Sequence, residues 1–195
     1  MFKNFINHFK TVCIHKYFVF HYMSKAGRPF HGFMHDWSKF NPIEFFESVK
    51  YFDGKISPIV KCKQANGYSL AWQHHKGTNP HHYEYWVDNL DKGGVAIKMP
   101  YKYVIELICD YLAAGRTYRG SDFTYKDELE WWKNKLANEN PKIHHETINF
   151  ITFVFTRLAS GMDELGPEVF EKAKDLVFLW HNEVTWYFSL EQIVG

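Results

Sequence analysis

The sequence predicts an all-α protein that forms a single domain of about seven helices. Apolar residues recur at intervals of three and four along most of the 195-residue chain, which is the spacing of a buried helical face. Proline and glycine separate these periodic segments, and residues 95–98 are the one short candidate strand. Hydrophobic residues make up 46% of the chain, which is enough to form one core. A length of 195 residues is short for two ordinary domains.

The first expected helix covers residues 2–24 and ends at Gly27, a residue type that favours the position after a helix. A short helical segment over residues 31–40 follows it. We interpret His8 and His21 in the first helix as surface residues or as core residues with a hydrogen-bond partner, because a single histidine on a helix is most often one of these.

Asn41 and Pro42 have the residue types of an N-cap and a first helical position, so we expect a helix over residues 42–52. Glu44 occupies the third helical position, where acidic residues complete a capping box. We therefore interpret Glu44 as a capping residue and not as a ligand. The next element covers residues 57–75, with a break at an asparagine and a glycine.

Asn79 and Pro80 are the expected start of another helix, which would place His81 and His82 in its first turn. Helical periodicity also marks four later segments, at residues 101–114, 124–138, 144–160 and 168–188. The last two are the C-terminal helices of residues 144–190, which are expected to pack on the preceding helices. We interpret the remaining histidines there as ordinary surface or core residues: His144, His145 and His181.

Composition narrows the classes of function. The net charge of +1 gives no overall field that would hold long nucleic acid or an anionic membrane. No apolar run approaches the ~18 residues of a membrane span, and no secretory signal is evident. The three cysteines are widely spaced, which indicates reduced core residues and neither a disulfide framework nor a thiolate zinc site. We expect a cytoplasmic protein.

The stretch HGFMHDWSKF, residues 31–40, is where chemistry is most expected. His35 and Asp36 offer an imidazole nitrogen and a carboxylate oxygen side by side, which together suit a divalent metal ion and an activated water. Lys39 lies three residues further on and offers an ammonium group for an anionic oxygen. Such a dipeptide also arises by chance, so its meaning depends on the other motifs.

Two pairs of histidines follow in AWQHHKGTNPHHYEYW, residues 71–86. The pairs flank a turn, so they can converge on one centre, although an exposed histidine-rich loop would have the same composition. The sequence alone does not distinguish His74 from His75 or His81 from His82 as the inward member. Asp110 interrupts an apolar helical segment, and by residue type alone the solvent face is favoured for it.

The order of His15, His35-Asp36 and Asp110 resembles the H…HD…D signature of the HD-domain metal-dependent phosphohydrolases, an all-α superfamily. The sequence HDWSK is similar to the HDxxK form found in HD enzymes that cleave phosphodiesters. More specifically, the chain resembles an uncharacterised HD-like family of bacteria and bacteriophages. That family is marked by HKxxV, HDxSKFxPxEF, AWxxHxxxNxHHxxxW and MPxxxxxExxxD, all present here with asparagine before the proline. The resemblance covers about residues 12–135.

The resemblance implies one or two divalent metal ions, of Mn, Fe, Mg, Zn or Co. Asp36 would bridge the two ions and act with Lys39 in catalysis. The implied metal ligands are His15, His35, Asp36, His75, His82 and Asp110, with His74 and His81 as the alternatives. The implied contacts to substrate are Lys39, Lys76, Arg116, Arg119, Tyr83 and Trp86, with the two arginines expected in a basic loop after the helix of Asp110.

The function expected from this resemblance is hydrolysis of a phosphoester in a small nucleotide by metal-activated water, with a cyclic signalling nucleotide among the candidates. Two alternatives stay open. One is a mixed-valent di-iron oxygenase, since the HD scaffold with extra histidines also supports iron oxidation. The other is a nucleotide-binding module without turnover. A small-molecule phosphoester is the expected partner, and the sequence leaves a homo-oligomer open.

Overall fold

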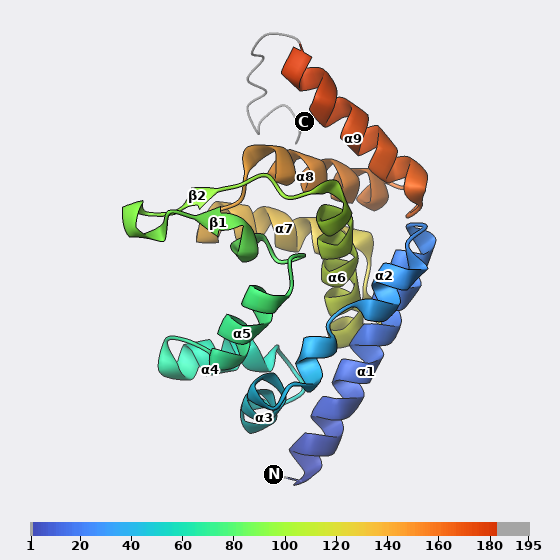
Figure 1. Cartoon of the computed structure of the whole chain (residues 1–195). Coiled ribbons are helices and arrows are strands. Elements are labelled where there is room, and N and C mark those ends of the chain that lie inside the picture. Colours follow the sequence, from blue (N-terminus) through green and yellow to red (C-terminus); the bar gives the residue numbers. More distant parts are fainter. Residues whose placement is uncertain (1, 183–195) are drawn as a thin grey trace.

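The computed structural model describes residues 2–182, with side chains to residue 176. The described part is helical apart from one two-stranded sheet, as predicted, and its number of helices is close to the expected seven. The helices, shown in Figure 1, are α1 (Phe2–Lys25), α2 (Pro29–Met34), α3 (Pro42–Tyr51), α4 (Pro58–Asn66), α5 (Leu70–Thr78), α6 (Tyr101–Arg119), α7 (Tyr125–Glu139), α8 (His145–Ala159) and α9 (Pro167–Asn182).

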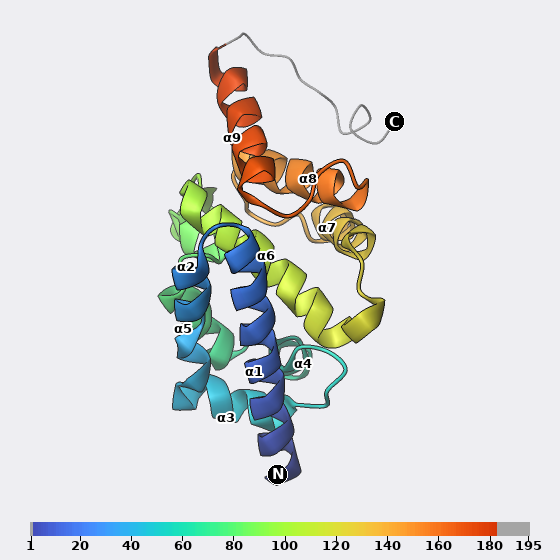
Figure 2. The same ribbon diagram turned by 90° about the vertical axis from the view of Figure 1, so that its right-hand side faces the viewer.

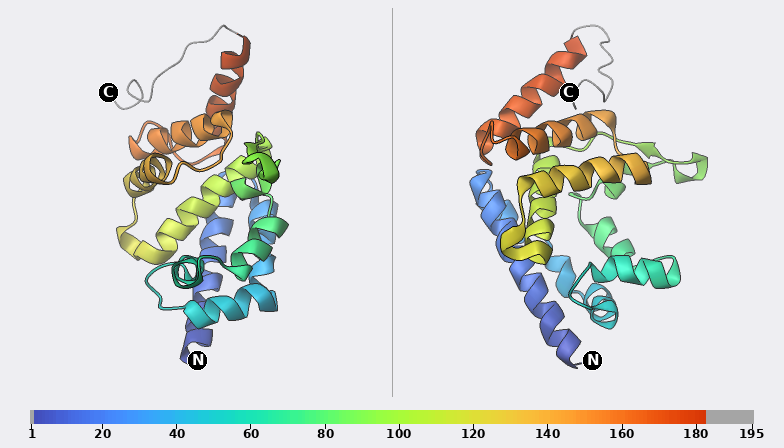
Figure 3. Two further views of the ribbon diagram at one scale, coloured as in Figure 1. Left: turned by 90° about the vertical axis from the view of Figure 1, so that its left-hand side faces the viewer. Right: turned by 180° about the vertical axis from the view of Figure 1, so that it is seen from behind.

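Helices α1 and α6 pack on each other and cross, and α6 lies in the middle of the described helices (Figures 1 and 2). Helix α2 runs back along α1 (Figure 2). Helices α3, α4 and α5 form a group at the N-terminal end of α1, whereas α7, α8 and α9 are stacked against the other side of α6 (Figure 3). One continuous buried cluster contains side chains from α1, α6, α7, α8 and α9, including Val19, Leu107, Trp132, Phe155 and Phe170.

Local sequence signals explain several element boundaries. Gly27 is the second residue after α1 and has a positive φ of 75°, a conformation that glycine tolerates best. The side chain of Asn41 accepts a hydrogen bond from the Ile43 amide at 2.9 Å and caps α3, as predicted. Thr124 and Asp127 form a reciprocal capping box at the start of α7.

Three expectations about the elements need correction or extension. No helix starts at Pro80, because the chain turns there and continues into the short 3₁₀ segment η2 (Tyr83–Trp86). Arg116 and Arg119 lie in the last turn of α6, which is longer than expected, so no basic loop forms. The candidate strand contains β2 (Val95–Ala96), which pairs antiparallel with β1 (Val87–Asp88), a partner that the sequence did not reveal.

The C-terminal end of the last expected helix, residues 183–188, lies outside the described residues, as does the side chain of His181. Among the described helices, none combines the length and the hydropathy of a membrane span.

Gly115 lets α6 pack closely against the start of α7. A Cβ atom at this position would lie 2.4 Å from Phe123 Cε2 and 2.7 Å from a carboxylate oxygen of Glu128. We therefore expect Gly115→Ala to lower the free energy of unfolding by about 1–3 kcal/mol, because this overpacking outweighs the helix propensity of alanine. Urea denaturation measures the change.

Gly77 in α5 is the matched control, because a Cβ atom there has no neighbour within 4 Å. Gly77→Ala should leave the free energy of unfolding unchanged or raise it by up to about 1 kcal/mol. If Gly115→Ala were as stable as Gly77→Ala, the close packing of α6 on α7 would be wrong.

Candidate metal centre

Asp36 lies where the chain passes from α2 into the 3₁₀ segment η1 (Trp37–Phe40), and it is only 2% exposed. Its backbone is left-handed, with φ 54° and ψ 36°, a conformation that is uncommon outside glycine and concentrates at functional sites. A buried carboxylate needs positive charge or hydrogen bonds around it. The surroundings of Asp36 supply imidazole rings and one lysine.

The first group of donor atoms comes from α1, the segment after α2, and α6. His15 Nε2 lies 3.0 Å from Asp110 Oδ1. His35 Nε2 lies 3.3 Å from the same oxygen and 3.1 Å from Asp36 Oδ2. Asp110 is 7% exposed, so it is buried as the family resemblance implies and does not lie on the solvent face that its residue type alone favoured. One donor atom from each of these four residues lies within 4.8 Å of the others.

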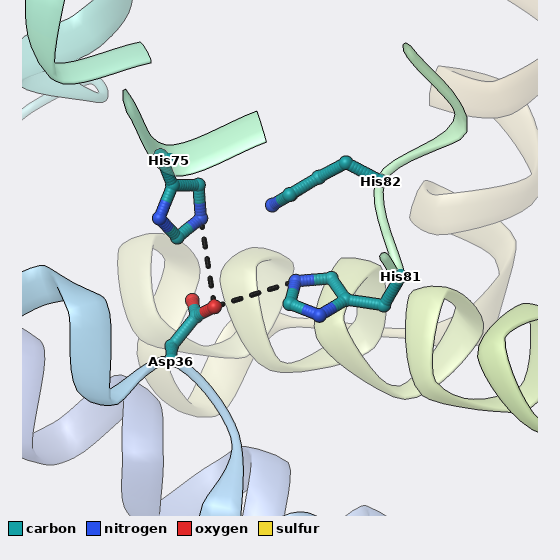
Figure 4. A group of neighbouring side chains, drawn as sticks. All are labelled: Asp36, His75, His81 and His82. Carbon is teal, nitrogen blue, oxygen red and sulfur yellow. Dashed lines mark ion pairs between the residues drawn. The ribbon is translucent and has the colours of Figure 1, made fainter. Parts of the chain in front are cut away.

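The second group shares Asp36 with the first and adds three histidines from α5 and the turn after it (Figure 4). His75 Nε2 lies 3.5 Å and His81 Nε2 lies 3.3 Å from Asp36 Oδ1. His82 completes the group, and all four residues are buried. The two oxygens of Asp36 thus face different groups, with Oδ2 near His35 and Oδ1 near His75 and His81.

Two buried glutamates hold the histidines from behind. Glu106 Oε1 lies 3.0 Å from His35 Nδ1 and 3.2 Å from His81 Nδ1. Glu44 lies 2.8 Å from His75 Nδ1 and 2.6 Å from His74 Nδ1. A carboxylate that accepts the Nδ1 proton leaves the lone pair on Nε2, which is the arrangement found behind metal-bound histidines. In His35, His75 and His81, the Nδ1 atoms therefore face the glutamates and the Nε2 atoms face Asp36.

The donor atoms fit a divalent cation better than they fit one another. Among the described side chains, four buried Nε2 atoms lack a partner with the alignment of a hydrogen bond: those of His15, His35, His81 and His82. Burial lowers the pKa of His82 well below its usual value, and the charge of His81 adds to this effect, so the ring is neutral. Buried neutral imidazoles together with carboxylates are a favourable donor set for transition-metal ions and zinc.

The pKa shifts of Asp36 and His35 also indicate a site that favours a cation. Burial alone would raise the pKa of Asp36, but the neighbouring imidazoles and the Lys39 ammonium hold it well below its usual range. Burial would lower the pKa of His35, but Asp36 and the other carboxylates raise it well above the usual value. The site thus attracts positive charge, and at His35 a proton and a metal ion compete for the same position.

Lys39 extends from η1 into the same centre. Its Nζ atom lies 2.6 Å from Asp36 Oδ2 and 3.3 Å from His75 Nε2. Burial would lower the pKa of Lys39, but the carboxylates of Asp36 and Asp110 raise it, so the ammonium stays charged. A fixed cation therefore lies beside both groups.

A cavity of about 690 Å³ opens directly onto these residues. Its inner wall includes His15, Lys39, His75, His82 and Asp110, and its outer wall comes from α4 and α7. A volume of this size holds a nucleotide-sized ligand. Its inner wall therefore brings such a ligand to the candidate metal ligands.

Comparison with known proteins gives one match, to a family of unknown function, DUF5662, over residues 4–157. The matched segment includes most of the chain and every residue of both donor groups. The chain belongs to the DUF5662 family. Searches among curated proteins and among solved structures gave no match.

The structure of this DUF5662 protein brings together most of the residues that the sequence singled out. His15, His35, Asp36 and Asp110 form one group, and both His81 and His82 join His75 in the other. His74 instead faces Glu44. Tyr83 lines the cavity, whereas four of the expected substrate contacts do not: Lys76, Trp86, Arg116 and Arg119.

The contacts of three of these residues explain their absence from the cavity. Trp86 Nε1 donates a hydrogen bond to the Pro80 carbonyl at 2.6 Å. Arg116 lies over the ring of Phe18, and Arg119 forms an ion pair with Asp127 at 2.6 Å. Since α6 continues to Arg119, neither arginine reaches the inner end of the cavity.

Sequence reasoning missed the two glutamates behind the histidines. The interpretation of Glu44 as a capping residue is wrong, because its carboxylate contacts His74 and His75. Glu106 received no role, although it lies one helical turn before Asp110 on the same face of α6. That spacing of four residues was the available signal.

Glu106→Gln tests the supporting role of this carboxylate. A neutral amide oxygen is a weaker acceptor for the two Nδ1 protons than a charged carboxylate, so we expect the affinity for Mn²⁺ or Zn²⁺ to fall about 10- to 100-fold with little change in fold. Calorimetric titration of the metal-free DUF5662 protein measures this affinity. Glu130→Gln, an exposed position in α7, is the control and should bind as the wild type does. Equal affinity of the two variants would exclude the supporting role.

Proposed function

We propose that this protein is an HD-type metal-dependent phosphohydrolase or phosphodiesterase that cleaves a phosphoester of a small nucleotide. The observation that carries the proposal is the shared position of Asp36, which contributes one oxygen to each of two buried donor groups at the inner end of a nucleotide-sized cavity. Paired sites of this kind serve in-line displacement at phosphorus. The H…HD…D order and the HDWSK motif support the same reaction.

Each donor group would bind one metal ion. His15, His35 and Asp110 would bind one ion, His75, His81 and His82 the other, and Asp36 both. Bound divalent ions would act as Lewis acids and would lower the pKa of a water molecule to near neutrality. Manganese, iron, zinc and cobalt suit a set of imidazoles and carboxylates, so we propose an ion of this kind in place of calcium.

The side chains of the protein would perform the remaining tasks. The Lys39 ammonium would contact a phosphoryl oxygen and offset the charge that grows there as the ester bond breaks. Glu44 and Glu106 would hold the Nδ1 protons of three histidines, so those rings keep their orientation through the reaction. The aromatic walls of the cavity would exclude bulk water and position the substrate.

The competing function is that of a di-iron oxygenase. Three histidines and a carboxylate in one group also suit iron, which would support reactions with oxygen. The two functions differ in their need for a redox change. Hydrolysis of phosphoesters under anaerobic conditions with Mn²⁺ would exclude the oxygenase as the explanation of that activity.

Lys39→Met tests the role of the ammonium group. With bis(p-nitrophenyl) phosphate or a nucleotide panel and Mn²⁺, we expect kcat to fall about 100-fold or more, since one charge-stabilising contact has that typical value. The metal content should stay at the wild-type level, because Lys39 is not one of the proposed metal ligands. Lys133→Met, an exposed lysine in α7, is the control and should keep the wild-type rate.

Two results would contradict the proposal. One is phosphoester hydrolysis that persists in protein stripped of metal by a chelator. The other is full activity of Lys39→Met together with normal metal content.

A further inference from the structure

The cavity continues beyond the metal centre into a region that the proposed reaction does not use. We call this region the outer chamber and define it by six of the lining residues: Lys63, Trp72, Tyr83, Glu84, Trp131 and Lys135. These residues come from α4, α5, η2 and α7. None of them contributes to the two donor groups around Asp36.

Aromatic rings connect the outer chamber to the metal centre. The Trp72 ring lies 4.9 Å from the ring of His82 and 5.8 Å from that of His75. The ammonium of Lys63 lies 4.6 Å from the centre of the same indole. In the same chamber, Lys135 Nζ lies 5.5 Å from the ring centre of Tyr83 and 5.7 Å from that of Trp131. A flat ligand that reaches the metal ions would therefore have aromatic surfaces beside it.

Two polar groups in the chamber lack a full set of partners within the described part of the chain. The Oε2 atom of Glu84 is buried and has no hydrogen-bond partner there, while burial and this carboxylate together raise the pKa of the neighbouring Tyr83 hydroxyl. The Lys63 ammonium contacts an indole ring and has no carboxylate within ion-pair distance among the described residues. Lys135, by contrast, is paired with Glu139 at 2.7 Å. A buried acceptor without a donor is unfavourable, and a ligand with N–H groups would satisfy it.

These groups favour a nucleobase over a second phosphate. A phosphate would meet the carboxylates of Glu84 and Glu139, which line the same cavity. A base can stack on the aromatic rings, and its N–H groups can donate to a carboxylate. Guanine presents two adjacent N–H donors for Glu84 and, next to them, a carbonyl oxygen for the Lys63 ammonium.

We infer that the outer chamber is a base-recognition subsite, in which Glu84 accepts N–H hydrogen bonds from a guanine-type base and Lys63 donates to its carbonyl oxygen. This inference rests on the proposed function, because the phosphoester of the same nucleotide would lie at the metal centre. It narrows the substrate class to nucleotides whose base carries donors beside a carbonyl group.

Calorimetric binding of three probes to the Mn²⁺-loaded protein tests the inference: guanosine 5′-monophosphate, inosine 5′-monophosphate and ribose 5-phosphate. Inosine lacks the 2-amino group, and ribose 5-phosphate lacks the base. We expect the guanosine nucleotide to bind about tenfold more tightly than the inosine nucleotide, as one hydrogen bond to a charged group predicts. We expect ribose 5-phosphate to bind more weakly than both.

Glu84→Gln should reduce the guanosine-to-inosine preference to about one while ribose 5-phosphate binds as before. Glu130→Gln, exposed in α7, should keep the wild-type preference. If Glu84→Gln does not fold, Lys63→Met serves instead and should weaken binding of both nucleotides without affecting ribose 5-phosphate. Equal binding of the three probes to the wild type would overturn the inference, and so would an unchanged preference in Glu84→Gln or unchanged nucleotide binding in Lys63→Met.

Hydrolysis of bis(p-nitrophenyl) phosphate, which has no base, separates the two proposals. If this ester is cleaved with Mn²⁺ but the wild type binds the three probes equally, the subsite is wrong and the proposed reaction stands. If no phosphoester is cleaved but the guanosine preference is present and depends on Glu84, the subsite stands and the reaction is wrong.

Discussion

The buried carboxylate of Asp36 is the feature on which the rest of the site depends. Removing a charge from water is costly unless positive charge or hydrogen bonds replace the solvent. Here the replacement comes from the Lys39 ammonium and from imidazoles on three sides. Those imidazoles have their outer nitrogens bound by Glu44 and Glu106, so the arrangement has carboxylate at the centre, histidine around it and carboxylate again outside. This arrangement favours a cation between the Asp36 carboxylate and the surrounding imidazoles.

The crossing of α1 and α6 brings the first donor group together across much of the sequence. His15 and Asp110 are far apart in the chain, yet their side chains are 3.0 Å apart because the two central helices pack directly on each other. The second group depends on α5 and on the turn at Pro80, which orients His81 and His82 toward Asp36 and its neighbours. The stable helical core therefore positions one group, and a short turn positions the other.

The sequence predicted the all-α class, the α3 cap at Asn41 and the residues that converge on Asp36, because these follow from periodicity, local capping and a spaced motif. It did not predict the roles of Glu44 and Glu106, since the histidines that they contact are distant in the chain. Local rules also failed at Pro80, where Asn79 and Pro80 have the residue types of a helix start. There the chain forms a turn that buries both His81 and His82, and tertiary contacts with Asp36 and Glu106 outweigh the local preference.

The most direct test of the central claim is a crystal structure of the protein with Mn²⁺, with anomalous diffraction used to locate the ions. The account predicts two anomalous peaks, one among His15, His35 and Asp110 and the other among His75, His81 and His82, with an oxygen of Asp36 bound to each. A protein that holds no ion between these side chains, or one whose ions lie at positions without contact to Asp36, would contradict it.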